Sequence, residues 1–155
     1  MAPEFIVLFS AMTPFIEMKL AIPLGLKLGL SGTSTFLFAV TGSIIPAAIT
    51  LALANPALKL IRKHSKFLDT FFTKLFHKTH HQHSKNFNRY GAFLITSFVA
   101  IPLPGSGSTA GALIAFVFGV DYWKALALVT LGTAIGGLLL TAGFESVFKL
   151  VHLFG

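Results

Sequence analysis

The chain contains no cysteine, which excludes disulfide bonds, thiolate catalysis and metal sites built on thiolates. Charged residues are scarce as well: they make up 11% of the 155 residues, against 54% hydrophobic residues, and the mean hydropathy is +0.80. A water-soluble chain of this length could not cover so much apolar surface with so few charges. No basic residue precedes Lys19, so a cleavable signal peptide is not expected.

Three long runs without a charged residue indicate that lipid surrounds the chain. A helix needs about 20 apolar residues to cross the hydrocarbon core of a bilayer, and each run is long enough. The sequence therefore predicts an all-α integral membrane protein, a single domain over residues 1–155 that is multi-pass in the cell membrane. The runs are Leu28–Leu58, Tyr90–Val120 and Ala125–Phe144.

Most of the net charge of +7 lies in a connector, residues 56–90, which holds eight basic residues and one acid. Cytoplasmic loops carry an excess of lysine and arginine, so the connector is predicted to be cytoplasmic and both termini extracytoplasmic. Its first part, residues 57–78, has the pattern of a basic amphipathic helix on the membrane surface. Because basic loops beside membrane spans are common, no nucleic-acid partner is expected.

The connector also contains a histidine-rich stretch, residues 77–83. Three of its histidines could share a helix face and bind a transition metal, but no acid or cysteine accompanies them. A solvated loop is the favoured interpretation, and no metal or other cofactor is predicted. Outside the connector, Glu145 and Lys149 are spaced i, i+4 and are expected to form a surface ion pair.

The two halves of the chain resemble each other. Residues 1–55 align with residues 91–145 at a constant offset of 90 without a gap. Each copy contains an apolar arm, a break at proline, a second arm that ends at glycine, and a longer uncharged helix. We therefore divide the chain into repeat one (1–55), the connector, repeat two (91–145) and a tail (146–155). The matched positions include Pro14 with Pro104, Gly29 with Gly119 and Gly42 with Gly132.

The break in the second copy reads FVAIPLPGSGSTAG (98–111) and places turn residues inside an apolar run. The arms beside it are about 10 residues long and would reach only the middle of the bilayer. They predict a re-entrant helical hairpin that returns near Pro104, with a kinked single span as the alternative. A hairpin makes no net crossing, so each repeat crosses once and the second copy inserts upside down. The predicted fold is an inverted repeat of re-entrant hairpin plus transmembrane helix, a construction common among secondary transporters.

Three stretches together resemble the small multidrug-export family: PFIEMKLAIPLGLKLGLS (14–31), GSIIPA (42–47) and FVAIPLPGSGSTAGALIAFVFGV (98–120). That family is similar to the wider DedA (VTT) superfamily of membrane proteins with paired re-entrant hairpins. The resemblance implies proton-coupled flipping of polyprenyl-phosphate lipids, or lipid scrambling. It places the acid–basic–proline pattern of the first hairpin on Glu17, Lys19 and Pro23. It places the pattern of the second hairpin on Pro102, Pro104, Gly105, Gly107 and Gly111.

Glu17 falls close to the turn of the first hairpin, where an acid is costly unless it is paired or reaches water. We interpret it as a carboxyl group that takes up and releases a proton in each transport cycle. Lys19 would pair with it or hold an anionic headgroup as a point charge. The alternatives are a structural contact between Glu17 and Lys19, or side chains that snorkel to a nearby membrane interface.

The turn of the second hairpin offers backbone N–H groups and hydroxyls at a helix start, which could receive a phosphate or carboxylate. The candidate substrate-binding residues there are Ser106, Gly107, Ser108 and Thr109. The alternative is a set of small residues that lets two hairpins pack closely. No nucleophile–base pair, Walker loop or esterase elbow is present in the sequence, so an enzyme is not expected.

The sequence thus predicts a secondary transporter or flippase, coupled to protons, with a site between two hairpins at the middle of the membrane. Its expected partners are the lipid bilayer, an amphipathic cargo (a lipid phosphate or a drug-like molecule) and a second copy in a homodimer. Two other classes stay open. One is a passive lipid scramblase or channel, and the other is a membrane partner protein that transports nothing.

Overall fold

The computed structural model describes residues 2–13, 17–64, 70, 73–74, 90–103 and 106–154. These residues form helices joined by short turns, with no strand among them, so the all-α prediction is confirmed. The labelled helices are α1 (Pro3–Met12), α2 (Glu17–Lys27), α3 (Gly32–His64), α5 (Ser108–Val117) and α6 (Tyr122–Phe154). A further helix, Tyr90–Ala100, precedes α5.

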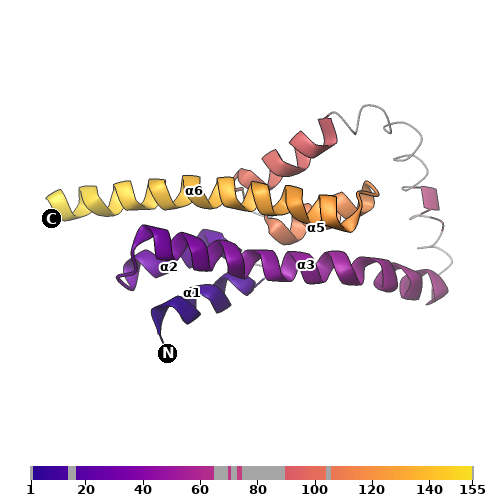
Figure 1. The fold of residues 1–155 in the computed structure, drawn as a ribbon, viewed down its shortest axis with the longest axis horizontal. Coiled ribbons are helices and arrows are strands. Elements are labelled where there is room, and N and C mark those ends of the chain that lie inside the picture. The colour runs from indigo at the N-terminus through magenta and orange to yellow at the C-terminus, as the bar shows by residue number, and fades with distance from the viewer. Residues whose placement is uncertain are drawn as a thin grey trace.

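Among the described residues, two helices are long and apolar enough to cross a membrane. Within α3 the apolar segment is Gly32–Leu60, with mean hydropathy 2.1, and within α6 it is Tyr122–Val151, with mean hydropathy 2.0. The two helices pack side by side and run in opposite directions, and both chain ends lie toward the same end of the molecule (Figure 1). Large apolar side chains are exposed all along the fold, among them Trp123 and Leu153, which suits a surface that faces lipid.

The shorter helices fill the space around this pair. Helices α1, α2, α5 and Tyr90–Ala100 each hold 10 or 11 residues and therefore extend about 15 Å, half of the hydrocarbon core. Helix α1 packs on α2 and α3, whereas α5 packs on both long helices. We call α1 and α2 the first short-helix set, and Tyr90–Ala100 and α5 the second. Both sets lie against the same antiparallel pair, α3 and α6.

The second arm of each repeat, α2 or α5, ends in the same way. Gly29 and Gly119 have φ angles of 84° and 70°, a left-handed conformation that favours glycine. The next amide, that of Leu30 or Val120, donates to a carbonyl five residues earlier at 3.1 and 3.0 Å, which is the Schellman ending of a helix. These bonds are repeated at an offset of 90, as are the bounds of α3 and α6.

The first arms follow a different offset, so the gapless alignment was wrong there. A Cβ at Gly42 would meet the carbonyl of Leu8, and a Cβ at Gly132 would meet that of Thr96, an offset of 88. The buried side chains show the same shift, because Val7 and Ala11 lie in one core cluster where Ile95 and Val99 lie in the other. The path from the first arm to the second is therefore two residues longer in the second copy.

Each hydrophobic core joins one set of short helices to parts of both long helices. The first cluster consists of Val7, Ala11, Met18, Ala21, Ile22 and Ala39, with Leu140 and Phe144 of α6 packed against it. The second consists of Ile95, Val99, Ala112, Ala115, Ala125 and Val129, together with Ala47 and Leu51 of α3. Because each long helix contributes to both cores, the two halves of the chain are interlocked. This packing holds the start of α2 against the start of α5.

Candidate functional site

Glu17 is the first residue of α2 and is only 6% exposed. Its φ angle of 43° is left-handed, an uncommon and strained conformation for a residue with a side chain. Strain of this kind persists only where surrounding contacts hold it, and it is concentrated at functional sites. The contacts of the carboxylate show what holds Glu17 in place.

The carboxylate of Glu17 lies at the start of α5, in the other half of the chain. The backbone N–H of Thr109 donates to its Oε1 at 3.4 Å. Gly107 precedes the first turn of α5, and a Cβ at this position would overlap the carboxylate. The φ angle of Gly107 is −170°, which any residue can adopt, so glycine is needed here for space alone. Glu17 therefore caps a helix that begins some 90 residues later in the chain.

This contact bears on the predicted anion site. The start of α5 combines free N–H groups with the positive end of the helix dipole, which favours a negative charge. In this structure the negative charge is the protein's own carboxylate, and Gly107 and Thr109 contact it directly. An external phosphate or carboxylate could use the same N–H groups only after Glu17 has moved away.

Lys19 does not pair with Glu17. Among the described residues the ion pair within 4 Å is Lys124–Asp121, at 3.6 Å and exposed. Residues two apart on a helix point to different sides, so the side chain of Lys19 contacts the segment between Tyr90–Ala100 and α5 at a different place from Glu17. Its Nζ donates to the carbonyls of Leu103 and Ser106. Both charged groups at the start of α2 thus contact the segment that leads into α5.

Ser106 organises that segment. Its hydroxyl is 2.5 Å from the carbonyl of Ile101 and 2.9 Å from that of Leu103, either of which can accept its proton. The amide of Leu103 donates back to the hydroxyl at 3.0 Å. Ser106 is 3% exposed, so its hydroxyl is used within the turn. The geometry gives Ser106 a structural role in this segment, and its role in binding substrate stays a prediction.

Ser108 contacts Ser43 of α3, a residue that was not among the predicted site residues. The hydroxyl of Ser108 donates to the carbonyl of Ser43 at 2.7 Å, and both residues are buried. Within the described part of the chain, the hydroxyls of Ser43 and Thr109 are buried without a hydrogen-bond partner. The GSIIPA stretch was the only sequence signal for a role of Ser43. Pro46 has no N–H to donate to the carbonyl of Gly42, so the hydrogen bonding of α3 is interrupted beside Ser43.

The remaining residues predicted to form the hairpin turns are found before α5, inside helices, or outside the described residues. Pro102 is exposed in the segment between Tyr90–Ala100 and α5. Pro23 and Gly111 are not in turns: Pro23 lies inside α2, and Gly111 lies inside α5, where a Cβ would meet Val99. Pro14, Pro104 and Gly105 lie outside the described residues, as do the histidine-rich stretch 77–83 and most of the connector. Among the described residues no group of three His, Cys, Asp or Glu side chains is placed to hold a metal ion.

The contact between the start of α2 and the start of α5 lies within one stretch that matches a protein family. Residues 17–139 match the family described as "Putative small multi-drug export protein", more than half of the chain. The chain belongs to this family. The matched range starts at Glu17 and includes Lys19, Ser43 and the turn from Ser106 to Thr109. No curated protein and no solved structure matches the chain. Membership and the two apolar helices together indicate a membrane protein, and the family description names multidrug export.

Proposed function

We propose that the protein is a proton-coupled secondary transporter for an amphipathic cargo, and that the contact between Glu17 and the start of α5 is its switch. The observation that carries the proposal is the position of the Glu17 carboxylate, buried on one short-helix set and capping a helix of the other. A carboxylate in such a place is unfavourable unless it is bound. Its charge therefore decides whether the two sets stay together.

The proposed cycle follows from competition for the same N–H groups. When Glu17 is ionised, its carboxylate accepts from Thr109 and closes the site. When Glu17 takes up a proton, it loses its charge and much of its attraction to the helix start. The N–H groups of α5 and the free hydroxyls of Ser43 and Thr109 can then bind a polar or anionic group of the cargo. When Glu17 loses the proton, its carboxylate returns to the start of α5 and expels the cargo. Proton release is thereby coupled to cargo release.

The proposal includes an inverted repeat with two re-entrant hairpins. It is supported by the antiparallel pair α3 and α6 (Figure 1), by the half-length arms and by the matched helix endings at Gly29 and Gly119. The connector would be cytoplasmic and both termini extracytoplasmic, with a homodimer in the lipid bilayer as the working unit. The relationship to DedA proteins, and with it a lipid-phosphate cargo, belongs to the same proposal.

The test measures transport in proteoliposomes with an imposed pH gradient. The cargoes are fluorescein, as a drug-like molecule with a carboxylate, and a fluorescent phosphate-bearing lipid. The wild-type protein is expected to move at least one of them faster with the gradient than without it. Glu17→Gln should remove this dependence on the gradient, whereas Glu4→Gln, which neutralises an acid in α1, should retain it.

The other functional classes are outcomes of the same assay. Movement that ignores the gradient in the wild type and persists in Glu17→Gln would indicate a passive scramblase or channel. No movement of either cargo would favour a membrane protein that acts through a partner. Either result would overturn proton-coupled transport through Glu17.

A further inference from the structure

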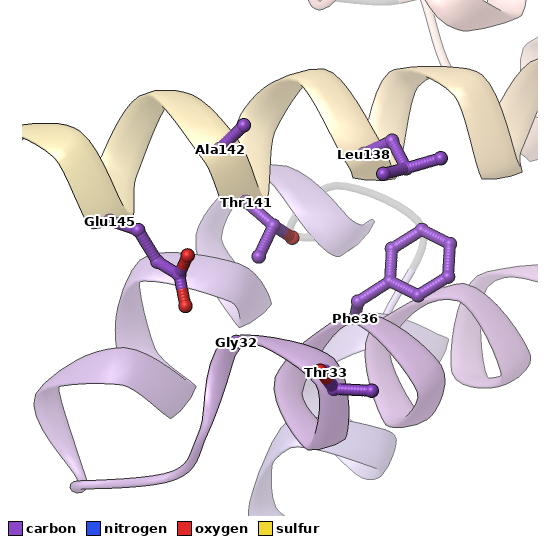
Figure 2. Close-up of a pocket in the computed structure, with 7 residues that line it drawn as sticks. All are labelled: Gly32, Thr33, Phe36, Leu138, Thr141, Ala142 and Glu145. Carbon is purple, nitrogen blue, oxygen red and sulfur yellow. The ribbon is translucent and has the colours of Figure 1, made fainter.

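A cavity of about 290 Å³ lies between the first turns of α3 and the later part of α6. It has no residue in common with the Glu17 contact. Its size is at the lower end of the range for small-molecule sites, which run from about 300 to 1,000 Å³. The lining residues are Gly32, Thr33, Phe36, Leu138, Thr141, Ala142 and Glu145 (Figure 2).

The charge in this cavity is negative. Figure 2 shows the side chains of Glu145 and Thr141, one helical turn apart on α6, both directed toward α3. The Glu145 carboxylate lies against Gly32, where a Cβ would overlap it. The expected pair between Glu145 and Lys149 is not formed, since no ion pair within 4 Å joins them in the part of the chain that the structure describes. The carboxylate is therefore free to attract a cation.

Thr141 supplies a second, independent indication of a ligand. It is 8% exposed, and its hydroxyl has no hydrogen-bond partner among the described residues. Thr41, Thr50 and Thr133 in the long helices donate their hydroxyls to the carbonyl four residues earlier, each at 2.7 Å, whereas Thr35 shares the unpartnered state of Thr141. Thr141 does not use this local partner, although a buried hydroxyl without one is unfavourable. A polar group in the cavity would satisfy it.

The aromatic and apolar walls define the kind of cation. The ring of Phe36 is directed from α3 toward α6, on the side of the cavity opposite to Thr141 and Glu145 (Figure 2). A carboxylate together with an aromatic ring recognises an ammonium group, by charge and by cation–π attraction. Leu138 and Ala142 provide contact for small apolar substituents. We infer that this cavity binds an organic ammonium ion with Glu145, Thr141 and Phe36 as its recognition residues.

The experiment measures equilibrium binding of benzyltrimethylammonium to the full chain in phosphatidylglycerol nanodiscs, whose lipid carries no ammonium group. Calorimetric titration, with empty nanodiscs subtracted, should show saturable binding. Glu145→Gln should weaken the affinity about tenfold or more, and Phe36→Leu about threefold. The matched control is Asp121→Asn, which neutralises an exposed acid at the start of α6 and should leave the affinity unchanged.

Thr141→Val separates binding from folding. Replacing an unpartnered buried hydroxyl by a methyl group should leave the fold as stable or more stable. If the hydroxyl contacts the ligand, the same change weakens binding. Equal affinity in the wild type, Glu145→Gln and Thr141→Val would overturn the inference, as would the absence of binding to the wild type. Because the readout is binding at equilibrium, the result does not depend on whether the Glu17 contact transports anything.

A second titration identifies the source of the ammonium group. In nanodiscs that contain phosphatidylethanolamine, a headgroup that occupies the cavity would compete and lower the apparent affinity for the probe. An unchanged affinity would identify a free molecule as the ligand. Both results support an ammonium site, and they distinguish a lipid from a soluble compound.

Discussion

Replacement of Gly107 by alanine tests the contact at the centre of the proposed transport site. The added Cβ would overlap the Glu17 carboxylate, while the extended backbone at Gly107 would accept alanine without strain. The change therefore acts through one contact. It should force Glu17 away from the N–H of Thr109 and separate the two short-helix sets.

The expected loss of stability has two parts. Removal of a capping interaction at a helix start costs about 0.5–2 kcal/mol. Overpacking of a buried contact costs about 1–3 kcal/mol. We therefore expect Gly107→Ala to lower the free energy of unfolding by about 1.5–5 kcal/mol. Gly143→Ala is the matched control, because a Cβ there meets nothing within 4 Å in α6, and it should raise stability by about 0.5–1 kcal/mol.

The measurement is reversible unfolding in mixed detergent micelles, with a double-mutant cycle to assign the cause. In a Glu17→Ala background the obstructing carboxylate is gone, so Gly107→Ala should then change the free energy of unfolding by no more than about 0.5 kcal/mol. An equal loss in both backgrounds would refute the reasoning, since it would show that the substitution acts somewhere other than at Glu17.

Two further predictions concern the charged groups and the topology. Lys19→Met removes the donor to the carbonyls of Leu103 and Ser106 and should lower the unfolding free energy by about 1–3 kcal/mol. Lys27→Met, at an exposed site in the same helix, should change it by no more than about 0.5 kcal/mol, and equal effects would count against the contact. Because the chain has no cysteine, Ala2→Cys, Leu153→Cys and Lys59→Cys can each be labelled alone in intact cells with an impermeant thiol reagent. We expect the first two to react from outside and the third only after permeabilisation, whereas labelling of all three from one side would mean that each repeat crosses an even number of times.

Local sequence patterns were enough to predict the helices. The uncharged runs gave α3 and α6, because the length of a crossing helix follows from the thickness of the bilayer. The endings at Gly29 and Gly119 were visible because only glycine readily adopts the left-handed conformation that ends a helix there. The alignment failed only before the turns, where a difference of two residues leaves no mark in an apolar arm.

Contacts between distant residues could not be predicted in the same way. Proximity in sequence suggested Lys19 as the partner of Glu17, yet the partner is the start of α5. Likewise, no sequence pattern paired Ser43 with Ser108, or placed Glu145 and Phe36 on one cavity. In each case the two residues lie 65 or more positions apart, and only the packing of α2 and α3 together with α5 and α6 brings them close.

The sequence by itself determined that the chain belongs in lipid and where its helices lie, because composition and helix endings are local properties of the chain. The tertiary structure decided what each buried polar group touches. A carboxylate or an ammonium removed from water is unfavourable unless it has a partner, and in an apolar chain few partners are close in sequence. The interlocked cores bring α2 to the start of α5, and this places Glu17 on the N–H group that we propose it shares with the cargo.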